Sequence, residues 1–351
     1  MTKHITRRDA IKGIGLAAGA AALPAGLATE ALAQAGGRVV VGTWGGDYAK
    51  LLAKNVEEPF LKPKGFDVVQ DLGDDKVRRT KTTAEQRLPR GTVDIQGFSA
   101  AQMFEMNEAG ALLQLDYSKL SNAPNIMPEM KYPYGIGHIY SGNVVVYNPK
   151  IVNPAPTAYK DGFDPKYGNK LGFIDIQYQF VMLAAALAAT GDMKQLEKGK
   201  ELLLAAKKGG CRLYPTNEAF AQGLKSEEIG IGLMWKARCV QWQNAGISVE
   251  SIAPAEGIMA YVSGFAIPKN APNKEGAYAY MNAMLEKQAQ EAFAVDMAYN
   301  PTVSNAVVAA DLKKRIGFSA DEVKRLKDLD YGFLAKNDAA MKEWWDKVFK
   351  A

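Results

Sequence analysis

Histidine is scarce in this sequence, and the motifs that build most active sites are missing. The chain holds two histidines among 351 residues, His4 and His138. It has no Gly-x-Ser-x-Gly nucleophile turn, no Walker-type phosphate loop and no Cys-x-x-Cys pair. Most acid–base catalysis and nearly all zinc sites need more than this. The sequence therefore predicts a protein that is not an enzyme, with no cofactor and no metal site.

Cysteine is equally rare, and the basic residues do not gather. An oxidising compartment would permit a disulfide between Cys211 and Cys239, but spacing alone does not give the geometry. A bridge and two buried thiols both stay open. The formal net charge is +5, yet the 43 Lys and Arg are spread along the chain. Nucleic-acid binding needs a concentrated basic face, so we expect no nucleic-acid partner.

The first 35 residues have the composition of an export signal. Arg7 and Arg8 stand just before an uncharged run over 14–27, and small residues follow at 31–35. A charged start, a short apolar run and an Ala-x-Ala site describe a cleaved signal, and the paired arginines indicate the twin-arginine route. The run is too short and too rich in Ala and Gly to hold across about 30 Å of hydrocarbon. We expect a signal peptide at 1–35, a periplasmic location and no stable membrane insertion, with a retained N-terminal anchor as the alternative.

Strands and helices alternate through the rest of the chain. The opening strand at 38–44 is a continuous apolar run of the kind buried in a parallel sheet. Further strands are expected at 66–69, 93–98, 144–147, 172–176, 229–235 and 264–268, and helices at 76–88, 100–109, 179–190, 194–208, 274–294 and 319–349. Ser319 and Glu322 are spaced as a capping box. The alternation predicts an α/β fold, and the length suits two lobes.

Four segments carry a family resemblance. They are the first strand with its turn (39–47), the strand 230–235, the stretch 263–277, and Tyr299-Asn300-Pro301-Thr302. In this order and at these spacings they resemble the receptors of ABC importers called extracellular solute-binding family 1, most closely the spermidine/putrescine-binding branch. The resemblance implies a two-lobed periplasmic binding protein fold, type II-like, that closes by a hinge around a ligand in the cleft.

In that fold the chain would cross between the lobes three times. The crossings would lie near 142–144, 262–265 and 301–305. Lobe 1 would then be 36–142 plus 263–303, and lobe 2 would be 143–262 plus 304–351. The implied function is a substrate-binding protein, expected as a monomer, that hands a small solute to an inner-membrane ABC permease. A binding module for a sensor kinase and a secreted enzyme using the same cleft are the alternatives.

Ligand contacts are expected where strands end at the cleft. Trp44 and Trp235 are the strongest candidates, since an aromatic ring at a strand end makes a flat wall for an organic cation. The resemblance places Trp235 against the ligand. The full set of candidates is Trp44, Gly45, Asp47, Tyr48, Phe98, Ser99, Tyr140, Ser141, Asp175, Gln179, Thr216, Trp235, Lys236, Arg238, Tyr261 and Ser263. His138 is expected as a wall of the cleft or as a structural histidine.

The charge of the ligand stays open. Polyamine receptors hold ammonium groups with carboxylates, but an expected glutamate is Gln179 here, and a tryptophan and an aspartate expected before the crossing strand are Ala260 and Val262. Lys236 and Arg238 would repel a diamine and could instead bind a carboxylate or phosphonate. An amino-group-containing solute is favoured, with Asp47, Asp74, Asp75 or Asp175 as its carboxylate. Ferric iron is disfavoured because no Tyr-Tyr pair is present.

Overall fold

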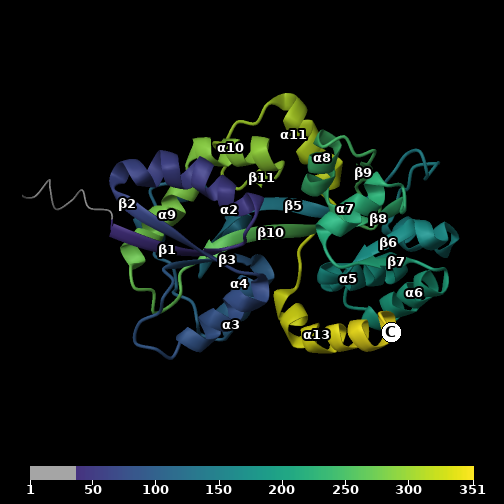
Figure 1. The fold of residues 1–351 in the computed structure, drawn as a ribbon, viewed down its shortest axis with the longest axis horizontal. Coiled ribbons are helices and arrows are strands. Elements are labelled where there is room, and N and C mark those ends of the chain that lie inside the picture. Colours follow the sequence, from purple (N-terminus) through teal and green to yellow (C-terminus); the bar gives the residue numbers. More distant parts are fainter. Residues whose placement is uncertain (1–36) are drawn as a thin grey trace, which may run out of the picture.

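A computed structural model describes residues 37–351. The expected signal peptide, residues 1–35, lies outside the described residues. One twisted sheet runs through the length of the molecule in the order β2-β1-β3-β10-β5-β8-β6-β7, and helices cover both of its faces (Figure 1). The two ends of this sheet form the centres of two lobes.

The first lobe is built on parallel strands. Val41 and Gly42 of β1 pair with Ile95 and Gln96 of β3, and β2 pairs with the other edge of β1. Its elements are β1 (Gly37–Thr43), α2 (Asp47–Leu52) with a π-helical continuation (Ala53–Leu61), β2 (Phe66–Leu72), α3 (Asp75–Glu85), β3 (Ile95–Ser99), α4 (Ala100–Glu108), β4 (Lys131–Tyr132), α9 (Lys274–Met284) and α10 (Lys287–Met297). One apolar core joins the strands to α2, α4, α9 and α10.

The second lobe repeats the strand–helix alternation. Its elements are β6 (Leu171–Ile174), α5 (Tyr178–Thr190), α6 (Leu196–Lys208), β7 (Arg212–Tyr214), α7 (Asn217–Lys225), β8 (Ile231–Trp235), α8 (Lys236–Asn244) and β9 (Glu250–Ile252). Two separate cores lie on the two faces of this sheet, one beneath α5 and α6 and the other beneath α7 and α8. Each lobe therefore has a core of its own.

Two long antiparallel strands join the lobes. The first half of β5 (Gly135–Tyr147) pairs with β10 (Ile258–Ala266), and its last five residues pair with β8 in the second lobe. Only part of β5, at 144–147, was expected from the sequence, because three glycines and His138 obscure its first half. A Cβ on Gly264 would lie 1.8 Å from the Ile136 carbonyl oxygen, so the two strands approach closely enough to exclude a side chain there.

The helix expected at 274–294 is two helices, α9 and α10. Glu286 leaves the helical conformation between them. The Gln290 side chain donates to the carbonyl oxygens of Met284 and His138, which stabilises the break and ties it to β5. A contact between a side chain of α10 and the backbone of a distant strand thus fixes a boundary that local propensity would not give.

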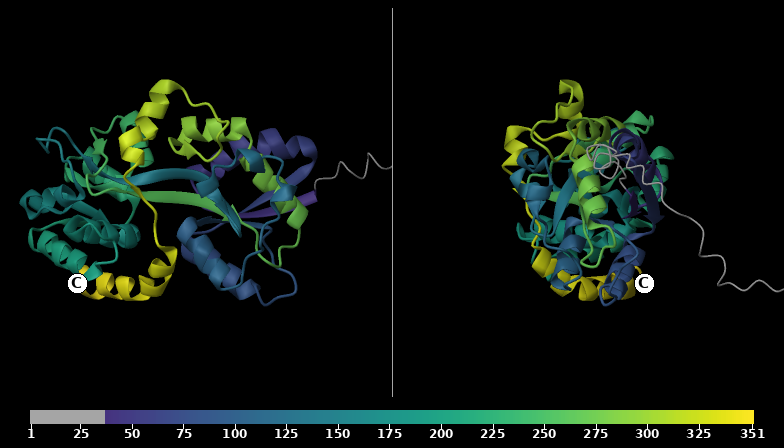
Figure 2. Two further views of the ribbon diagram at one scale, coloured as in Figure 1. Left: turned by 180° about the vertical axis from the view of Figure 1, so that it is seen from behind. Right: turned by 90° about the vertical axis from the view of Figure 1, so that its left-hand side faces the viewer.

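The C-terminal segment touches both lobes. It comprises β11 (Asn300–Pro301), α11 (Ala310–Ile316), α12 (Ala320–Val323), β12 (Leu326–Lys327) and α13 (Tyr331–Trp344). The capping box of Ser319 and Glu322 is present, but the helix that it begins is short, and α13 is a separate helix. Figure 2 shows α13 beneath the second lobe with its first turn close to α4, and it contacts both α4 and α5.

Candidate functional site

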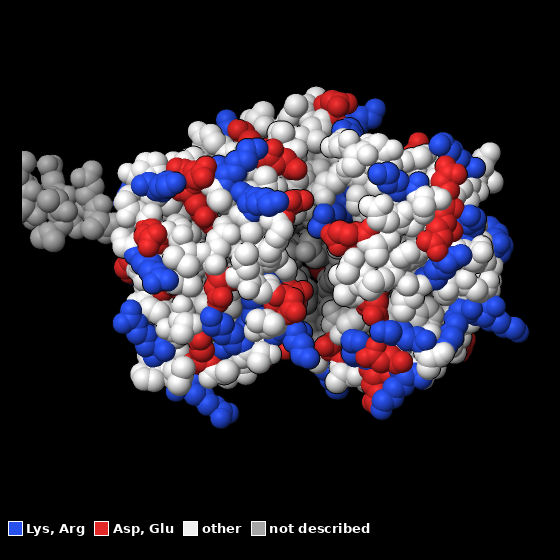
Figure 3. Space-filling view, viewed as in Figure 1, with Lys and Arg blue, Asp and Glu red and all other residues white. Residues whose placement is uncertain are grey.

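A groove separates the two lobes on the face shown in Figure 3. Acidic and basic side chains lie on both of its rims (Figure 3). The carboxyl ends of β1 and β3 in one lobe, and of β6 and β8 in the other, lead into the turns between the lobes, where ligands collect in open α/β sheets. The sequence-predicted residues follow these strand ends.

Four aromatic side chains gather where β8 and β10 flank β5 on its two sides. The Trp235 ring stacks on the Tyr261 ring with centroids 4.4 Å apart, and Phe180 at the start of α5 meets the edge of Trp235 at 4.4 Å. Tyr299, just before β11, lies 6.1 Å from Tyr261. Trp235 and Asn143 are register partners on β8 and β5, and both side-chain polar atoms of Asn143 are buried without a partner among residues 37–351. We call the four rings of Phe180, Trp235, Tyr261 and Tyr299 the hinge aromatic cluster.

Trp44 forms a second aromatic wall on the first lobe. Its indole Nε1 donates to the Asp75 carboxylate at 2.6 Å, and the Arg78 guanidinium lies over its ring at 4.1 Å. Arg78 also donates to Asp75 at 2.6 Å and to the Gly97 carbonyl oxygen at 3.0 Å. The Arg78 side chain is 3% exposed, whereas that of Asp75 is 48% exposed. This arrangement fixes the indole and leaves the carboxylate open to solvent.

Tyr48 packs against the Trp44 ring. The two rings meet edge to face at 5.2 Å, and the Tyr48 hydroxyl lies 2.8 Å from Nδ1 of His138. His138 is fully buried, and burial lowers its pKa to about 3. Such a histidine stays neutral at physiological pH, and its contact is with the Tyr48 hydroxyl.

The remaining predicted residues of the first lobe have structural contacts. Gly45 and Asp47 are exposed, and Asp47 pairs with Lys50. Phe98 is fully buried in the core, and Ser99 caps α4 through a capping box with Gln102. None of these four residues joins the aromatic walls.

Two predicted residues of β5 also make structural contacts instead of joining the aromatic walls. Tyr140 is half-buried among the first-lobe core, and its backbone carbonyl accepts from Asn300. The Ser141 hydroxyl accepts from the backbone N–H of Ala237, which fastens β5 to the start of α8. Ser263, in contrast, lies 2.7 Å from the Tyr261 hydroxyl and orients it.

The predicted polar residues at the start of α5 are held by the C-terminal helix. Asp175 accepts from Trp345 Nε1 and pairs with Lys350, both at 2.7 Å. Gln179 donates to Asp338 at 2.6 Å. Thr216 caps α7 by accepting from the backbone of Ala219.

The two predicted cations beside Trp235 diverge. Lys236 donates to the Gly317 carbonyl oxygen and lies 4.7 Å from the centre of the Phe318 ring, so it faces the segment after α11. Arg238 donates to Gln241 at 2.9 Å. It also lies beside Tyr299: burial raises the pKa of Tyr299, and the Arg238 guanidinium opposes that rise. Arg238, not Lys236, is thus the cation next to the hinge aromatic cluster.

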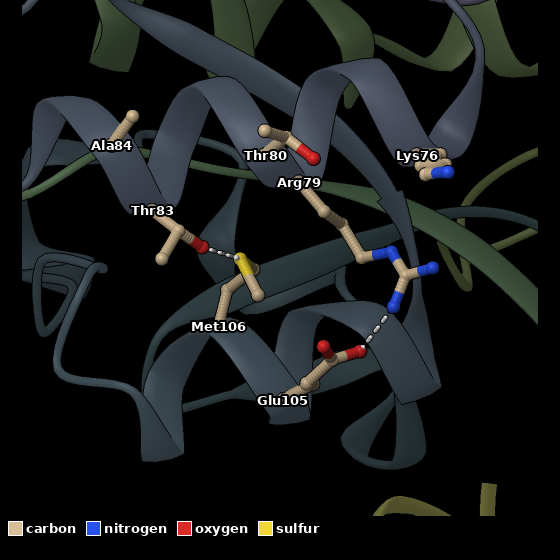
Figure 4. Close-up of a pocket in the computed structure, with 7 residues that line it drawn as sticks. All are labelled: Lys76, Arg79, Thr80, Thr83, Ala84, Glu105 and Met106. Atoms are coloured by element: carbon tan, nitrogen blue, oxygen red, sulfur yellow. Dashed lines mark hydrogen bonds and ion pairs between the residues drawn. The ribbon is translucent and has the colours of Figure 1, made fainter. Parts of the chain in front are cut away.

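A separate groove lies between α3 and α4 (Figure 4). Its volume is about 440 Å³, and its lining includes Lys76, Arg79 and Glu105. Arg79 and Glu105 form an ion pair of 2.7 Å across it. No sequence-predicted site residue lines this groove.

Three other features bear on function. Within residues 37–351 no cluster of three or more His, Cys, Asp or Glu side chains is arranged to hold a metal ion. Cys211 and Cys239 are free thiols, and burial raises their pKa values to about 11 and about 12. No helix in the same part of the chain is both long and apolar enough to span a membrane.

Sequence reasoning missed three contributors to the site. Tyr299 lies in a segment that carries the family resemblance, but it is not among the expected ligand contacts. Arg78 lies inside a polar helix, and Phe180 inside an apolar one, so neither stands out by pattern. Asp75 was one of four candidate carboxylates, and it is the one that binds the Trp44 indole; Asp74 caps α3, while Asp47 and Asp175 pair with lysines.

Comparison with known proteins agrees with this geometry. The family described as bacterial extracellular solute-binding protein matches residues 58–320. A spermidine/putrescine-binding periplasmic protein of Salmonella typhimurium is 26% identical over 259 residues, covering 69% of this chain and 72% of the relative.

Solved structures are similar over almost the whole described chain. An ABC transporter structure from Clostridium perfringens has a TM-score of 0.74 at 25% identity and covers 89% of this chain and 99% of that one. A spermidine/putrescine ABC transporter substrate-binding protein from Streptococcus pneumoniae has a TM-score of 0.70 at 21% identity, covering 90% and 99%. The expected two-lobed α/β fold and the expected family are confirmed.

Proposed function

This chain belongs to the bacterial extracellular solute-binding proteins, and from that premise we propose that it is the periplasmic receptor of an ABC importer. It captures a small organic solute that carries at least one amino group. The lobes close around the solute, and the protein delivers it unchanged to an inner-membrane permease. The receptor acts as a monomer.

The hinge aromatic cluster is the observation that carries this proposal. Its rings come from α5, β8, β10 and the segment before β11, which are elements of both lobes and of the strand that joins them. Trp44 adds a wall from the first lobe. Aromatic faces attract organic cations by several tenths to about 2 kcal/mol, depending on how far the cation is desolvated. A ligand held between such walls would stabilise lobe closure.

Asp75 supports an amino group in the ligand. A buried ammonium needs an opposing charge, and the half-exposed Asp75 carboxylate stands beside the Trp44 wall. The curated relative that binds spermidine and putrescine points to the same chemistry. A ligand with an anionic group is the alternative, because Arg238 lies beside Tyr299.

The side chains near the site support release of the solute unchanged. A catalyst needs an activated nucleophile or a poised acid–base pair. His138 has its pKa lowered to about 3 by burial, and it is enclosed between Tyr48 and Phe293. The proposal is therefore binding without turnover.

Export and lobe movement complete the proposal. Residues 1–35 direct the chain through the twin-arginine route, and segments 36–142 and 263–303 move against 143–262 and 304–351 on closure. Changing both Arg7 and Arg8 to Lys should abolish export. Unimpaired export of that variant would exclude the route while leaving the receptor function untouched.

The experiment that tests the function begins with protein purified from the periplasm. Mass spectrometry of the small molecules released on unfolding should give one compound with an amino group. Adding this compound back should decrease the radius of gyration in small-angle scattering, with one-to-one stoichiometry in calorimetry. Recovery of a chemically altered compound after incubation would overturn the receptor function in favour of an enzyme.

A further inference from the structure

Two opposite charges approach Tyr261 from different elements. Tyr261 lies in the middle of β10, stacked on Trp235, and its hydroxyl is held by Ser263 at 2.7 Å. Burial raises the pKa of this hydroxyl; the Asp75 carboxylate adds to the rise and the Arg238 guanidinium opposes it. Asp75 is fixed to Trp44 of the first lobe, and Arg238 follows Trp235 in the first turn of α8 of the second lobe, so the two charges come from opposite lobes.

The anion belongs to the first lobe and has capacity for another donor. One Asp75 oxygen, Oδ1, accepts from both Trp44 Nε1 and Arg78 at 2.6 Å. Among residues 37–351 no hydrogen bond reaches its second oxygen, Oδ2. Arg78 pairs with Oδ1 and also donates to two backbone carbonyl oxygens, so its guanidinium is held inside the lobe and does not cover Oδ2. Oδ2 is the free acceptor at this wall.

The cation belongs to the second lobe and has donors to spare. Arg238 lies in the first turn of α8, directly after Trp235 and Lys236. A guanidinium offers five N–H donors, and one hydrogen bond, to Gln241, is made within the described residues, besides the contact with Tyr299. Its planar fork matches a carboxylate. Lys236 does not share this position because it is bound to Gly317.

We propose that the solute is a small amino-carboxylate, with its ammonium group against Asp75, its carboxylate against Arg238 and its carbon chain on the Trp235–Tyr261 stack. This inference rests on the receptor function proposed above. A diamine would place an ammonium beside Arg238, and a dicarboxylate would place an anion beside Asp75. Each mismatch is a like-charge contact in a desolvated site, which selects against that ligand.

The test uses full-length exported protein and three series of unbranched probes of two to six carbons. They are amino-carboxylates with the two groups at opposite ends, the diamines of the same lengths, and the dicarboxylates of the same lengths. Calorimetry should find that the tightest amino-carboxylate binds at least tenfold more tightly than the diamine and the dicarboxylate of equal length. A diamine or a dicarboxylate as the tightest probe, or binding by no probe, would overturn the proposal.

Paired variants then assign the two ends. Asp75→Asn should weaken the amino-carboxylate about thirtyfold or more, since an ammonium loses its counter-charge. Asp74→Asn removes the same charge one residue away, and Asn caps a helix as well as Asp does, so it should leave affinity unchanged. Equal losses in the two variants would show a general field effect and would overturn the contact with Asp75.

Arg238→Gln should shift the selectivity of the site from amino-carboxylates toward diamines. It should weaken the amino-carboxylate by a similar factor and strengthen the diamine, because a like charge is gone. Arg315→Gln, whose guanidinium contacts Gln243 and Asn244 at the other end of α8, is the charge-matched control. A gain in affinity for the diamine would also show that the variant is folded. If the variant has a normal melting curve but binds none of the probes, the contact with Arg238 is overturned.

Failure of this inference and failure of the receptor function are distinguishable. If the compound released from periplasmic protein is recovered unchanged, closes the lobes and lacks a carboxylate, the receptor function stands and the amino-carboxylate is excluded. If the released compound carries both groups but is chemically altered by the protein, the ligand class stands and the receptor function fails.

Discussion

The Trp235 ring lies almost parallel to the Tyr261 ring, with an interplanar angle of 20° and centroids 4.4 Å apart. Trp235 ends β8 of the second lobe, whereas Tyr261 stands in the strand that leads back to the first lobe. The stack therefore joins the end of β8 to a strand that runs between the two lobes. Trp235 is 6% exposed, so a ligand would meet one face or edge of a ring that is otherwise packed.

Replacing Trp235 by Ala should weaken ligand binding by about 2 kcal/mol or more, as for a central aromatic anchor. Trp242→Ala is the matched control, because Trp242 is also buried, on the same core, but packs on Phe220 away from the cluster. Both variants should lose about 3–5 kcal/mol of unfolding free energy. Calorimetry with the compound released from the native protein separates the two effects. The same affinity in both variants would mean that Trp235 serves the core alone.

A substitution at Gly97 tests whether the position of the Trp44 ring matters for ligand binding. A Cβ at Gly97 would lie 2.9 Å from the Trp44 ring and 3.1 Å from the Phe265 ring. Gly97→Ala should therefore shift the indole away from Asp75, lower ligand affinity about tenfold and cost about 1–3 kcal/mol of stability. Gly162→Ala crowds only Leu233 and Val145 in the second lobe, and should cost stability alone. Unchanged affinity in Gly97→Ala would argue that the position of Trp44 does not matter.

β1, β2, β3, β6 and β8 were predictable from apolar runs, and Trp44 and Trp235 from their place at strand ends. The short strands β7 and β9 and the rings of Phe180 and Tyr299 were not predicted. The first half of β5 was not, because Gly135, Gly137 and Gly142 are there to admit neighbouring side chains rather than to form turns. The hydrogen-bond partners of the polar site residues could not be predicted from the sequence either. Whether Asp175 faces a ligand or the C-terminal helix depends on a contact with Trp345, which is 170 residues distant.

Asp175 should act mainly as an anchor for the C-terminus. Asp175→Ala should lower the unfolding free energy by about 1–2 kcal/mol, because Trp345 Nε1 and the Lys350 ammonium lose a charged acceptor. Lys350→Met should lose less, since its side chain is 34% exposed and its partner's is 25% exposed. Urea denaturation of the two single variants and the double variant gives their coupling. Strictly additive losses would show that the ion pair contributes nothing in solution.

His138 should make the protein sensitive to acid. Its pKa is lowered to about 3 by burial, whereas an unfolded histidine titrates near 6.5. Between these two values the unfolded chain binds a proton that the folded protein excludes, so the unfolding free energy falls as the pH falls. The slope approaches about 1.4 kcal/mol per pH unit.

His138→Gln keeps a hydrogen-bonding group for the Tyr48 hydroxyl, which lies 2.8 Å from Nδ1, and it removes the titration. Between pH 6.5 and 4.5 the native protein should therefore lose about 2–3 kcal/mol more than the variant in urea denaturation. Subtracting one curve from the other cancels the carboxylates that both proteins share. Parallel curves over that range would mean that His138 can accept a proton without unfolding, which its enclosure by Tyr48 and Phe293 should prevent.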